Sequence, residues 1–133
     1  MTEDIKTLMK LFVEIGNEYK NEILSLFDED VTKYTLALLI ADANEKYGFY
    51  LSQGKLKYVE GSEANYLLNN ATVTAITTSD FIIKIINSEN WEKTCRFGYN
   101  VGLISYQTRD RRYIKHGKNL LKLINYINKI AGE

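Results

Sequence analysis

The residue types that most often do chemistry are rare in this chain of 133 residues, which has one cysteine, Cys95, and one histidine, His116. A cysteine acts as a nucleophile when its pKa is lowered, and Lys93 and Arg96 are close enough in sequence to Cys95 to lower it. A lone cysteine on a short apolar helix can instead simply pack in the core, which is the interpretation we favour. One thiol and one imidazole nearly exclude a zinc cluster, and they exclude a mechanism that needs several histidines.

Three adjacent carboxylates are the only acidic cluster that suggests acid–base or metal chemistry: Asp28, Glu29 and Asp30. No further ligand follows at the spacing of a calcium loop, and adjacent carboxylates at a helix end are typically solvated. The sequence also lacks the dinucleotide-binding, P-loop, nucleophile-elbow, zinc-protease and EF-hand motifs. We therefore expect no catalytic residue, no cofactor and no metal, and we keep an enzyme only as a minor alternative.

A basic segment, residues 109–118, carries five positive residues and one negative residue, a local charge of +4. Because Lys+Arg and Asp+Glu are both 17, the rest of the chain carries −4. Arg111 and Arg112 are candidates for holding an anionic headgroup, since guanidinium groups bind phosphate through two parallel hydrogen bonds. Weak contact with an anionic membrane is one expectation and a solvated loop is the other, whereas the net charge of zero argues against a nucleic-acid partner.

The composition is that of a folded globular protein, with 45% hydrophobic and 26% charged residues, and no linker divides it. We expect a single domain over residues 1–133. The single cysteine allows no internal disulfide, and the acidic start with Glu3 and Asp4 is unlike a signal peptide. These features favour a cytoplasmic protein that spans no membrane. The absence of proline and the ten tyrosines are typical of an AT-rich genome, and a thermophilic microbe would fit.

The spacing of apolar residues predicts where the helices and strands lie. Helices are expected at 5–15, 19–27, 80–87 and 91–97 and after Gly117, with a short helical turn at 63–68. Strands are expected at 34–41, 47–52, 56–59, 71–77 and 101–106. Gln53 and Gly54 predict a hairpin turn, Thr78 and Asn90 predict helix caps, and Gly98 predicts a helix end. Strands and helices do not alternate one for one, which indicates an α+β fold.

The most distinctive stretch is the strand ATVTAI (71–76) followed, after a polar cap, by the very apolar helix DFIIKII (80–86). This order, with a second helix, a strand and a terminal helix after it, resembles the sterol carrier protein 2 (SCP2) family. The later strand departs from that family's pattern, because FGYNVG (97–102) lacks the usual Gly-Lys pair. The resemblance covers about residues 3–131 and rests on the order of elements.

The resemblance implies a five-stranded, mixed and mostly antiparallel sheet with helices packed on one face. It also implies an apolar cavity between helices and sheet that binds sterols, fatty acyl chains or other lipids without a covalent step or a metal. The residues expected to bind the hydrophobic ligand are Phe81, Ile82, Ile85, Ile86, Trp91, Phe97, Leu103, Ile124 and Ile127.

Two alternatives remain open from the residues themselves. The apolar excess at Phe81, Ile82, Ile85 and Ile86 also suits a solid core, because protein interiors are normally close-packed. A protein–protein interaction module or homodimer without a ligand is the other alternative, since exposed apolar surface marks such interfaces. The aromatic strand residues expected to serve it are Tyr47, Phe49, Tyr50 and Tyr58.

Overall fold

The computed structural model describes residues 2–109 and 113–132 of the chain. Their helices and strands follow one another as α1 (Thr2–Glu18), α2 (Lys20–Ser25), β1 (Leu36–Ile40), β2 (Glu45–Ser52), β3 (Lys55–Glu60), the 3-10 helix η1 (Gly61–Ala64), α3 (Asn65–Asn70), β4 (Val73–Thr77), α4 (Ser79–Asn87), α5 (Trp91–Val101), β5 (Ile104–Thr108) and α6 (Tyr113–Ala131). The predicted α+β class is confirmed, and each predicted strand has a counterpart within about three residues of its expected ends.

All five strands form one sheet in the order β3-β2-β1-β4-β5. The central strands β1 and β4 run parallel, with Leu36 opposite Val73, and the other three pairs are antiparallel. The sheet is therefore mixed and mostly antiparallel, as predicted. Because side chains alternate between the faces of a sheet, every second residue of each strand points toward the same layer of helices.

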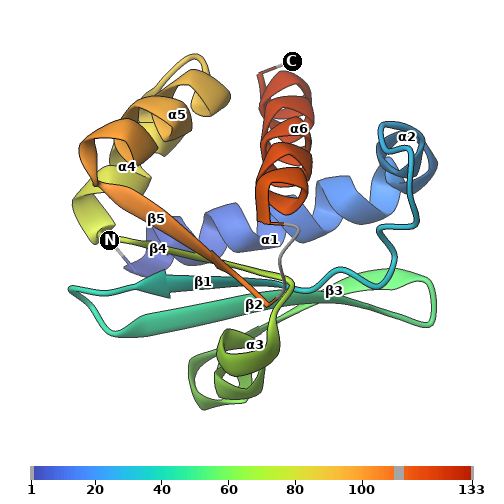
Figure 1. Ribbon diagram of the computed structural model, residues 1–133, viewed down its shortest axis with the longest axis horizontal. Coiled ribbons are helices and arrows are strands. Elements are labelled where there is room, and N and C mark those ends of the chain that lie inside the picture. Colours follow the sequence, from blue (N-terminus) through green and yellow to red (C-terminus); the bar gives the residue numbers. More distant parts are fainter. Residues whose placement is uncertain (1, 110–112, 133) are drawn as a thin grey trace.

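Helices α1, α4, α5 and α6 cover one face of the sheet, which we call the inner face, and α1 lies along it (Figure 1). The main hydrophobic core lies between this face and these helices. The short helix α3 lies on the opposite face, where Leu67 packs in a small second cluster with Ala37 and Ala71. The predicted one-sided helix layer thus describes the four longest helices, and α3 adds a partial cover on the other side.

The predicted caps and hairpin turn are present. Thr78 accepts a hydrogen bond from the Phe81 backbone N–H and begins α4, and Asn90 accepts one from the Lys93 N–H and begins α5. Gln53 and Gly54 form the two-residue connection between β2 and β3, with φ values of 51° and 78°. These local signals therefore place the starts of α4 and α5 and the turn between β2 and β3 correctly.

The predicted helix end at Gly98 is wrong, because α5 continues to Val101 and Gly102 ends it in the left-handed conformation, with φ 83°. Gly98 instead allows α4 and α5 to approach each other closely. A Cβ atom at this position would lie 2.1 Å from Cζ of Phe81 on α4. The last strand consequently begins at Ile104 rather than at residue 101.

Two other glycines also lie inside helices rather than at their ends. The first helix, expected at 5–15, does not stop before Gly16, since α1 runs to Glu18 and Gly16 packs against Leu56 of β3. The C-terminal helix begins at Tyr113, before Gly117. In both helices the apolar stripe packs against the core, which outweighs the roughly 0.5–1 kcal/mol that a helical glycine costs.

Candidate functional site

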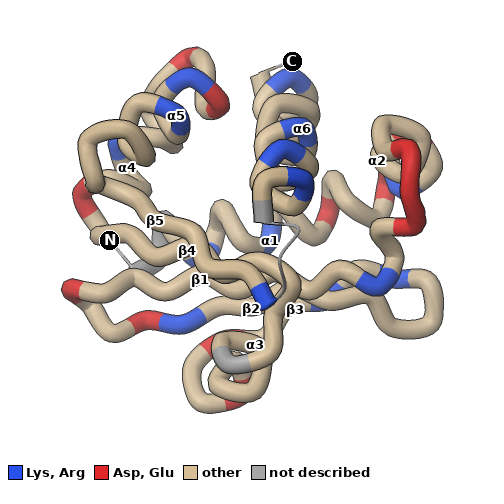
Figure 2. Tube along the Cα trace, in the orientation of Figure 1, with Lys and Arg blue, Asp and Glu red and all other residues tan. Residues whose placement is uncertain are grey.

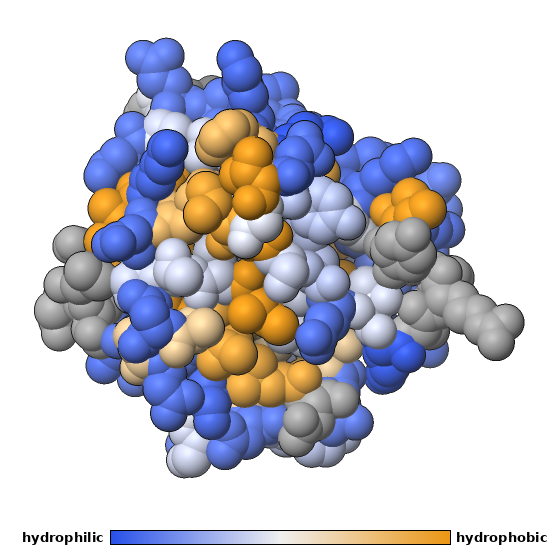
Figure 3. Space-filling model, turned by 60° about the vertical axis from the view of Figure 1, so that its left-hand side comes forward, coloured by the Kyte–Doolittle hydropathy of each residue, from blue (hydrophilic) through white to orange (hydrophobic). Residues whose placement is uncertain are grey.

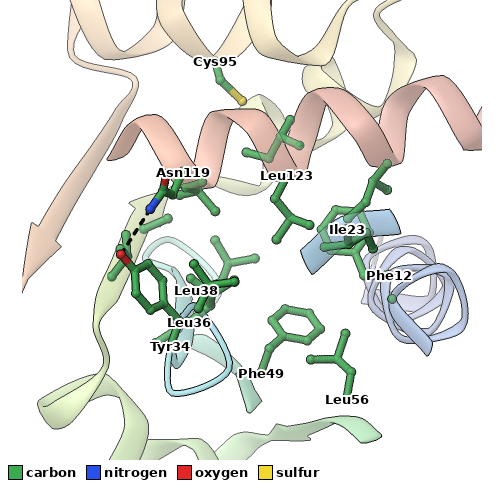
Figure 4. Close-up of a pocket in the computed structure, with 18 of the residues that line it drawn as sticks. Phe12, Ile23, Tyr34, Leu36, Leu38, Phe49, Leu56, Cys95, Asn119 and Leu123 are labelled. Atoms are coloured by element: carbon green, nitrogen blue, oxygen red, sulfur yellow. Dashed lines mark hydrogen bonds between the residues drawn. The ribbon is translucent and has the colours of Figure 1, made fainter. Parts of the chain in front are cut away.

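An apolar cavity of about 230 Å³ lies between the inner face of the sheet and the helices. Its sheet side consists of alternating strand residues, among them Leu36 and Leu38 of β1 and Phe49 of β2. Figure 4 shows these side chains directed toward the same space as Phe12 of α1 and Leu123 of α6. The cavity therefore exists because the inward-facing residues of five strands and five helices leave a space that none of them fills.

The size of the cavity limits what can enter it. An engineered apolar cavity of about 150 Å³ stays dry and takes up benzene, a molecule of six carbons. In proportion, about 230 Å³ accommodates an apolar segment of roughly nine carbons. A void of this size in an interior that is otherwise close-packed is unusual, and its lining forgoes the dispersion contacts that a filled core would have.

Six of the nine residues predicted to bind the ligand line this cavity, namely Ile82, Ile85, Ile86, Trp91, Ile124 and Ile127. They come from three helices, α4, α5 and α6, that are brought together only by the fold. The stripe of each helix faces the sheet because one side of an amphipathic helix must bury its apolar residues. Their place around the cavity is thus observed, and their role in binding stays a prediction.

Phe81, Phe97 and Leu103 do not line the cavity, which corrects the prediction for these three positions. Phe81 lies on the side of α4 that faces α5, and its ring packs over Gly98. Phe97 is 50% exposed, with the Lys84 ammonium 5.5 Å from its ring centre. Leu103 is 42% exposed in the turn between α5 and β5. The helix α5 turns Phe97 outward because Cys95 and Gly98 occupy its buried side.

The sequence-based prediction missed the contribution of the sheet and of α1 to the cavity. Phe12 packs against both Phe49 and Trp91, with ring centres 6.0 Å and 6.1 Å apart, and Phe49 also packs against Tyr58. The signal was available in the strand alternation of Phe49 and Leu51 and in the apolar stripe of the first helix. Tyr47 and Phe49 are buried, so these aromatic residues do not form the exposed surface that the interaction hypothesis expected.

One end of the cavity is polar and is formed by Tyr34, His116 and Asn119. His116 and Asn119 lie on α6 and are only 2% and 6% exposed. His116 Nδ1 lies 2.7 Å from the Tyr34 hydroxyl oxygen, and the Asn119 side-chain amide donates to the same oxygen at 3.1 Å (Figure 4). These bonds connect the segment before β1 with the first turns of α6.

The carboxylate of Glu29 holds this group of residues together. It accepts hydrogen bonds from the Tyr34 hydroxyl and from Asn119 Nδ2, and Lys115 Nζ lies 2.8 Å from its other oxygen. The hydrogen bonds from Lys115 and Tyr34 lower the pKa of Glu29 from its ordinary 4.5 to about 2. Glu29 is therefore ionised at neutral pH, and the prediction that the acidic cluster is merely solvated is wrong for this member.

The number of hydrogens that each side chain can donate determines which group donates and which accepts in these hydrogen bonds. The single hydrogen of the Tyr34 hydroxyl is donated to Glu29, so its oxygen accepts from Asn119 and from His116. This assignment places a hydrogen on His116 Nδ1. Both amide hydrogens of Asn119 are used as well, on Glu29 and Tyr34. The donors at this end of the cavity are thus committed to Glu29 and to one another.

Beneath α5 the lining contains a thiol and a phenol, Cys95 and Tyr106. Burial raises the pKa of Cys95 to about 11, so the thiol stays protonated at neutral pH. Burial also raises the pKa of Tyr106 well above its usual range. Its hydroxyl oxygen is out of contact with solvent and has no hydrogen-bond partner among the described residues. Figure 4 shows the Cys95 sulfur directed toward the cavity.

The basic segment divides between the surface and the interior. His116 turns inward to Tyr34, and Lys115 pairs with Glu29. Arg111 and Arg112, the predicted anion-binding residues, lie outside the described residues. Figure 2 shows further lysines along α6 and a run of acidic residues beside α2.

Neither a metal site nor a membrane-spanning helix is found in the described part of the chain. Nowhere in residues 2–109 and 113–132 do three or more His, Cys, Asp or Glu side chains gather closely enough to hold a metal ion. None of the helices described has the length and apolarity needed to cross a bilayer.

Apolar side chains are exposed where α5 turns into the edge strand β5. Phe97, Tyr99, Val101 and Leu103 are all exposed there. The side of the molecule on which α4 and α5 lie carries a band of apolar residues down its middle (Figure 3). A surface of this kind is typical of contacts with other molecules.

Comparison with known proteins gives a likeness in structure and none in sequence. No protein-family model and no curated protein match the chain. A solved structure described as the UbiJ-SCP2 ubiquinone synthesis protein superposes with a TM-score of 0.59 at 13% identity, over 95% of this chain and 94% of that one.

Two structures of the sec-alkylsulfatase Pisa1, one from Pseudomonas sp. and one of a double mutant, are also similar, at 19% and 18% identity. They cover 69% and 68% of this chain and 12% of theirs, with TM-scores of 0.46 and 0.47, too low to carry an argument. The near-complete superposition on the UbiJ-SCP2 structure confirms the resemblance in fold, and the chain has an SCP2-like α+β fold.

Proposed function

We propose that this protein binds a lipid or another hydrophobic small molecule in the cavity, and that it catalyses no reaction on it. The observation that carries the proposal is the apolar space of about 230 Å³ between sheet and helices. Ligand sites are typically concave, mostly apolar and provided with a few polar groups, and the lining of this cavity follows that description.

The chemistry of the lining supports binding rather than catalysis. Cys95 is held as a neutral thiol by burial, so it is a poor nucleophile. His116 is tied through Tyr34 to an ionised Glu29, which makes this group a structural connection between α6 and the segment before β1. We also propose that the protein needs no metal or cofactor, binds no nucleic acid and works in the cytoplasm.

The name of the similar structure refers to ubiquinone synthesis. Ubiquinone carries a long isoprenoid chain, so isoprenoid chains join fatty acyl chains among the ligands to be tried. The first experiment is native mass spectrometry of the purified protein, followed by extraction and identification of bound lipid. Lipid retained at the monomer mass would support the proposal. A protein that retains no lipid and takes up neither a fluorescent fatty acid nor an isoprenoid alcohol would refute it.

The second candidate is a homodimer or another protein–protein interaction, which the exposed apolar residues Phe97, Val101 and Leu103 favour. They adjoin β5, an edge strand of the sheet, and unpaired strand edges readily pair with a second chain. The same mass spectrum tests this candidate, because a ligand-free dimer would favour it. Val101→Lys should then yield monomers, whereas a protein already monomeric at all concentrations would exclude a stable dimer.

A further inference from the structure

The hydroxyl of Tyr106 is the feature of the cavity that the fold does not explain. Tyr106 lies on β5 opposite Ala75, on the inner face of the sheet, and lines the cavity. Its ring packs on that of Tyr99, with centres 5.7 Å apart. The hydroxyl oxygen is shielded from solvent, yet it neither donates nor accepts a hydrogen bond within the described part of the chain.

A buried hydroxyl without a partner is unfavourable, because it has lost its bonds to water and gained none in return. Native proteins keep few such groups, and those that persist usually have a reason. A phenylalanine would fill the same place without this cost. The presence of a tyrosine therefore indicates a partner that is not part of the chain's described residues.

A trapped water is a weak explanation for this site. A buried water is held by two to four polar partners. Near the Tyr106 hydroxyl the cavity lining offers the Cys95 thiol, which is a weak hydrogen-bonding group. The remaining surface is almost entirely hydrocarbon, which suits the body of an apolar ligand better than a water molecule.

We propose that the Tyr106 hydroxyl donates a hydrogen bond to a neutral oxygen, a carbonyl or a hydroxyl, that the hydrophobic ligand carries within the cavity. This inference rests on the proposed function and specifies the ligand's chemistry. The other polar end of the cavity is less suited to this role, because the donors of Tyr34 and Asn119 are already committed to Glu29.

The oxygen is a neutral one because, among the described residues that line the cavity, none beside Tyr106 carries a positive charge that would neutralise a carboxylate. The lining lysine, Lys20, is bonded to the Gly54 carbonyl at the end of β2 and β3, at the opposite edge of the sheet from β5. Arg96, on α5, is near enough to Tyr106 to act on it electrostatically, but its guanidinium is exposed and paired with Glu92. An ionised carboxylate that enters an apolar site without such a partner is strongly disfavoured.

The experiment compares three probes of nine carbons each, the capacity worked from the cavity volume, on delipidated protein: 2-nonanone, nonane and nonanoate. Their affinities are measured by displacement of a fluorescent apolar dye from the native protein, from Tyr106→Phe and from Tyr99→Phe. Tyr99 is the matched control, because its ring adjoins Tyr106 but is exposed. The affinities of one probe for two proteins are compared, so the contribution of the probe's solubility in water is the same in both and cancels. The difference in affinity then reports the effect of the hydroxyl alone.

The ketone should bind Tyr106→Phe about 5- to 30-fold more weakly than the native protein, the range expected when one buried hydrogen bond is lost. Nonane should bind all three proteins equally, and nonanoate should bind less well than the ketone. If the ketone loses no affinity in Tyr106→Phe while both neutral probes bind, the inference is overturned and the proposed function stands. If no probe binds the native protein, both are overturned.

The thermal stability of the empty protein provides a second readout. Removing a hydroxyl that has no partner should leave the melting temperature of Tyr106→Phe unchanged or higher. A fall of several degrees, absent in Tyr99→Phe, would mean that the hydroxyl already has a partner within the folded chain. That result would overturn the inference even if ligand affinity also changed.

Discussion

Replacing Ile85 with tryptophan should fill the cavity and exclude the ligand. Ile85 lies on α4, is buried and lines the cavity. Tryptophan adds about six non-hydrogen atoms to the side chain, against a capacity of roughly nine carbons worked from the cavity volume. At about 0.8 kcal/mol per buried methylene, displacing six of them removes about 5 kcal/mol, a loss of more than a thousandfold in affinity.

The same variant distinguishes a cavity from a solid core. In a filled core the larger side chain would cost about 1–3 kcal/mol through overpacking. That cost corresponds to a melting temperature lower by roughly 3–6 °C per kcal/mol for a chain of this length. In a real cavity the indole finds space, so the melting temperature should stay level or rise.

The assay is uptake of a fluorescent fatty acid, with circular dichroism and thermal unfolding measured on the same samples. Ile83→Trp is the matched control, because Ile83 is on the same helix but faces a separate groove between α1 and α4 rather than the cavity. Native-like uptake by folded Ile85→Trp, or a melting temperature that falls as overpacking requires, would refute the reasoning.

Three further predictions concern Glu29, Gly98 and the two arginines of the basic segment. Because the folded-state pKa of Glu29 is lowered from 4.5 to about 2, its contribution to stability is complete above pH 4.5 and is lost as the pH falls toward 2. Glu29→Gln should therefore be less stable than the native protein at pH 7, with a difference that shrinks below pH 4.5; a constant difference in urea unfolding would contradict this. Gly98→Ala should lose about 1–3 kcal/mol in urea unfolding, since its Cβ would meet the Phe81 ring, and Phe81→Leu in the same chain should recover part of the loss. Arg111→Ala combined with Arg112→Ala should weaken co-sedimentation with anionic vesicles, and salt should weaken binding of the native protein; equal binding by both proteins would leave these arginines without that role.

The sequence carries most of the information about local structure. Apolar alternation located the strands, and side-chain caps at Thr78 and Asn90 located the starts of α4 and α5. These features depend on neighbours in the chain, so they can be recognised without the fold. The role of Gly98 could not be recognised from the sequence, because it depends on Phe81 of another helix, which lies within contact distance only in the folded protein.

The site was predicted only in part, because some of its residues stand out in the local sequence and others are brought together only by the fold. The helical stripe with Ile82 and Ile85 was found because it is more apolar than one packed face requires. The inner residues of β1 and β2 looked like ordinary strand residues, and only their register places them beside the helices. The inward turn of His116 was hidden by its basic neighbours in sequence, since its partner Tyr34 is 82 residues away.

The helix α6 forms one wall of the cavity and contacts α1, α5, β4 and β5, yet it follows all of them in the chain. Folded proteins open locally in cooperative units, and we expect α6 to behave as one of them. A ligand that contacts Leu123 and Ile127 would be released whenever α6 moves away, so its residence time is limited by the frequency of that opening. Bound ligand in turn makes the opening less favourable by RT ln(1 + [L]/Kd). If the proposed ligand binds, the exchange rates of the α6 amide hydrogens should therefore fall as the cavity is occupied.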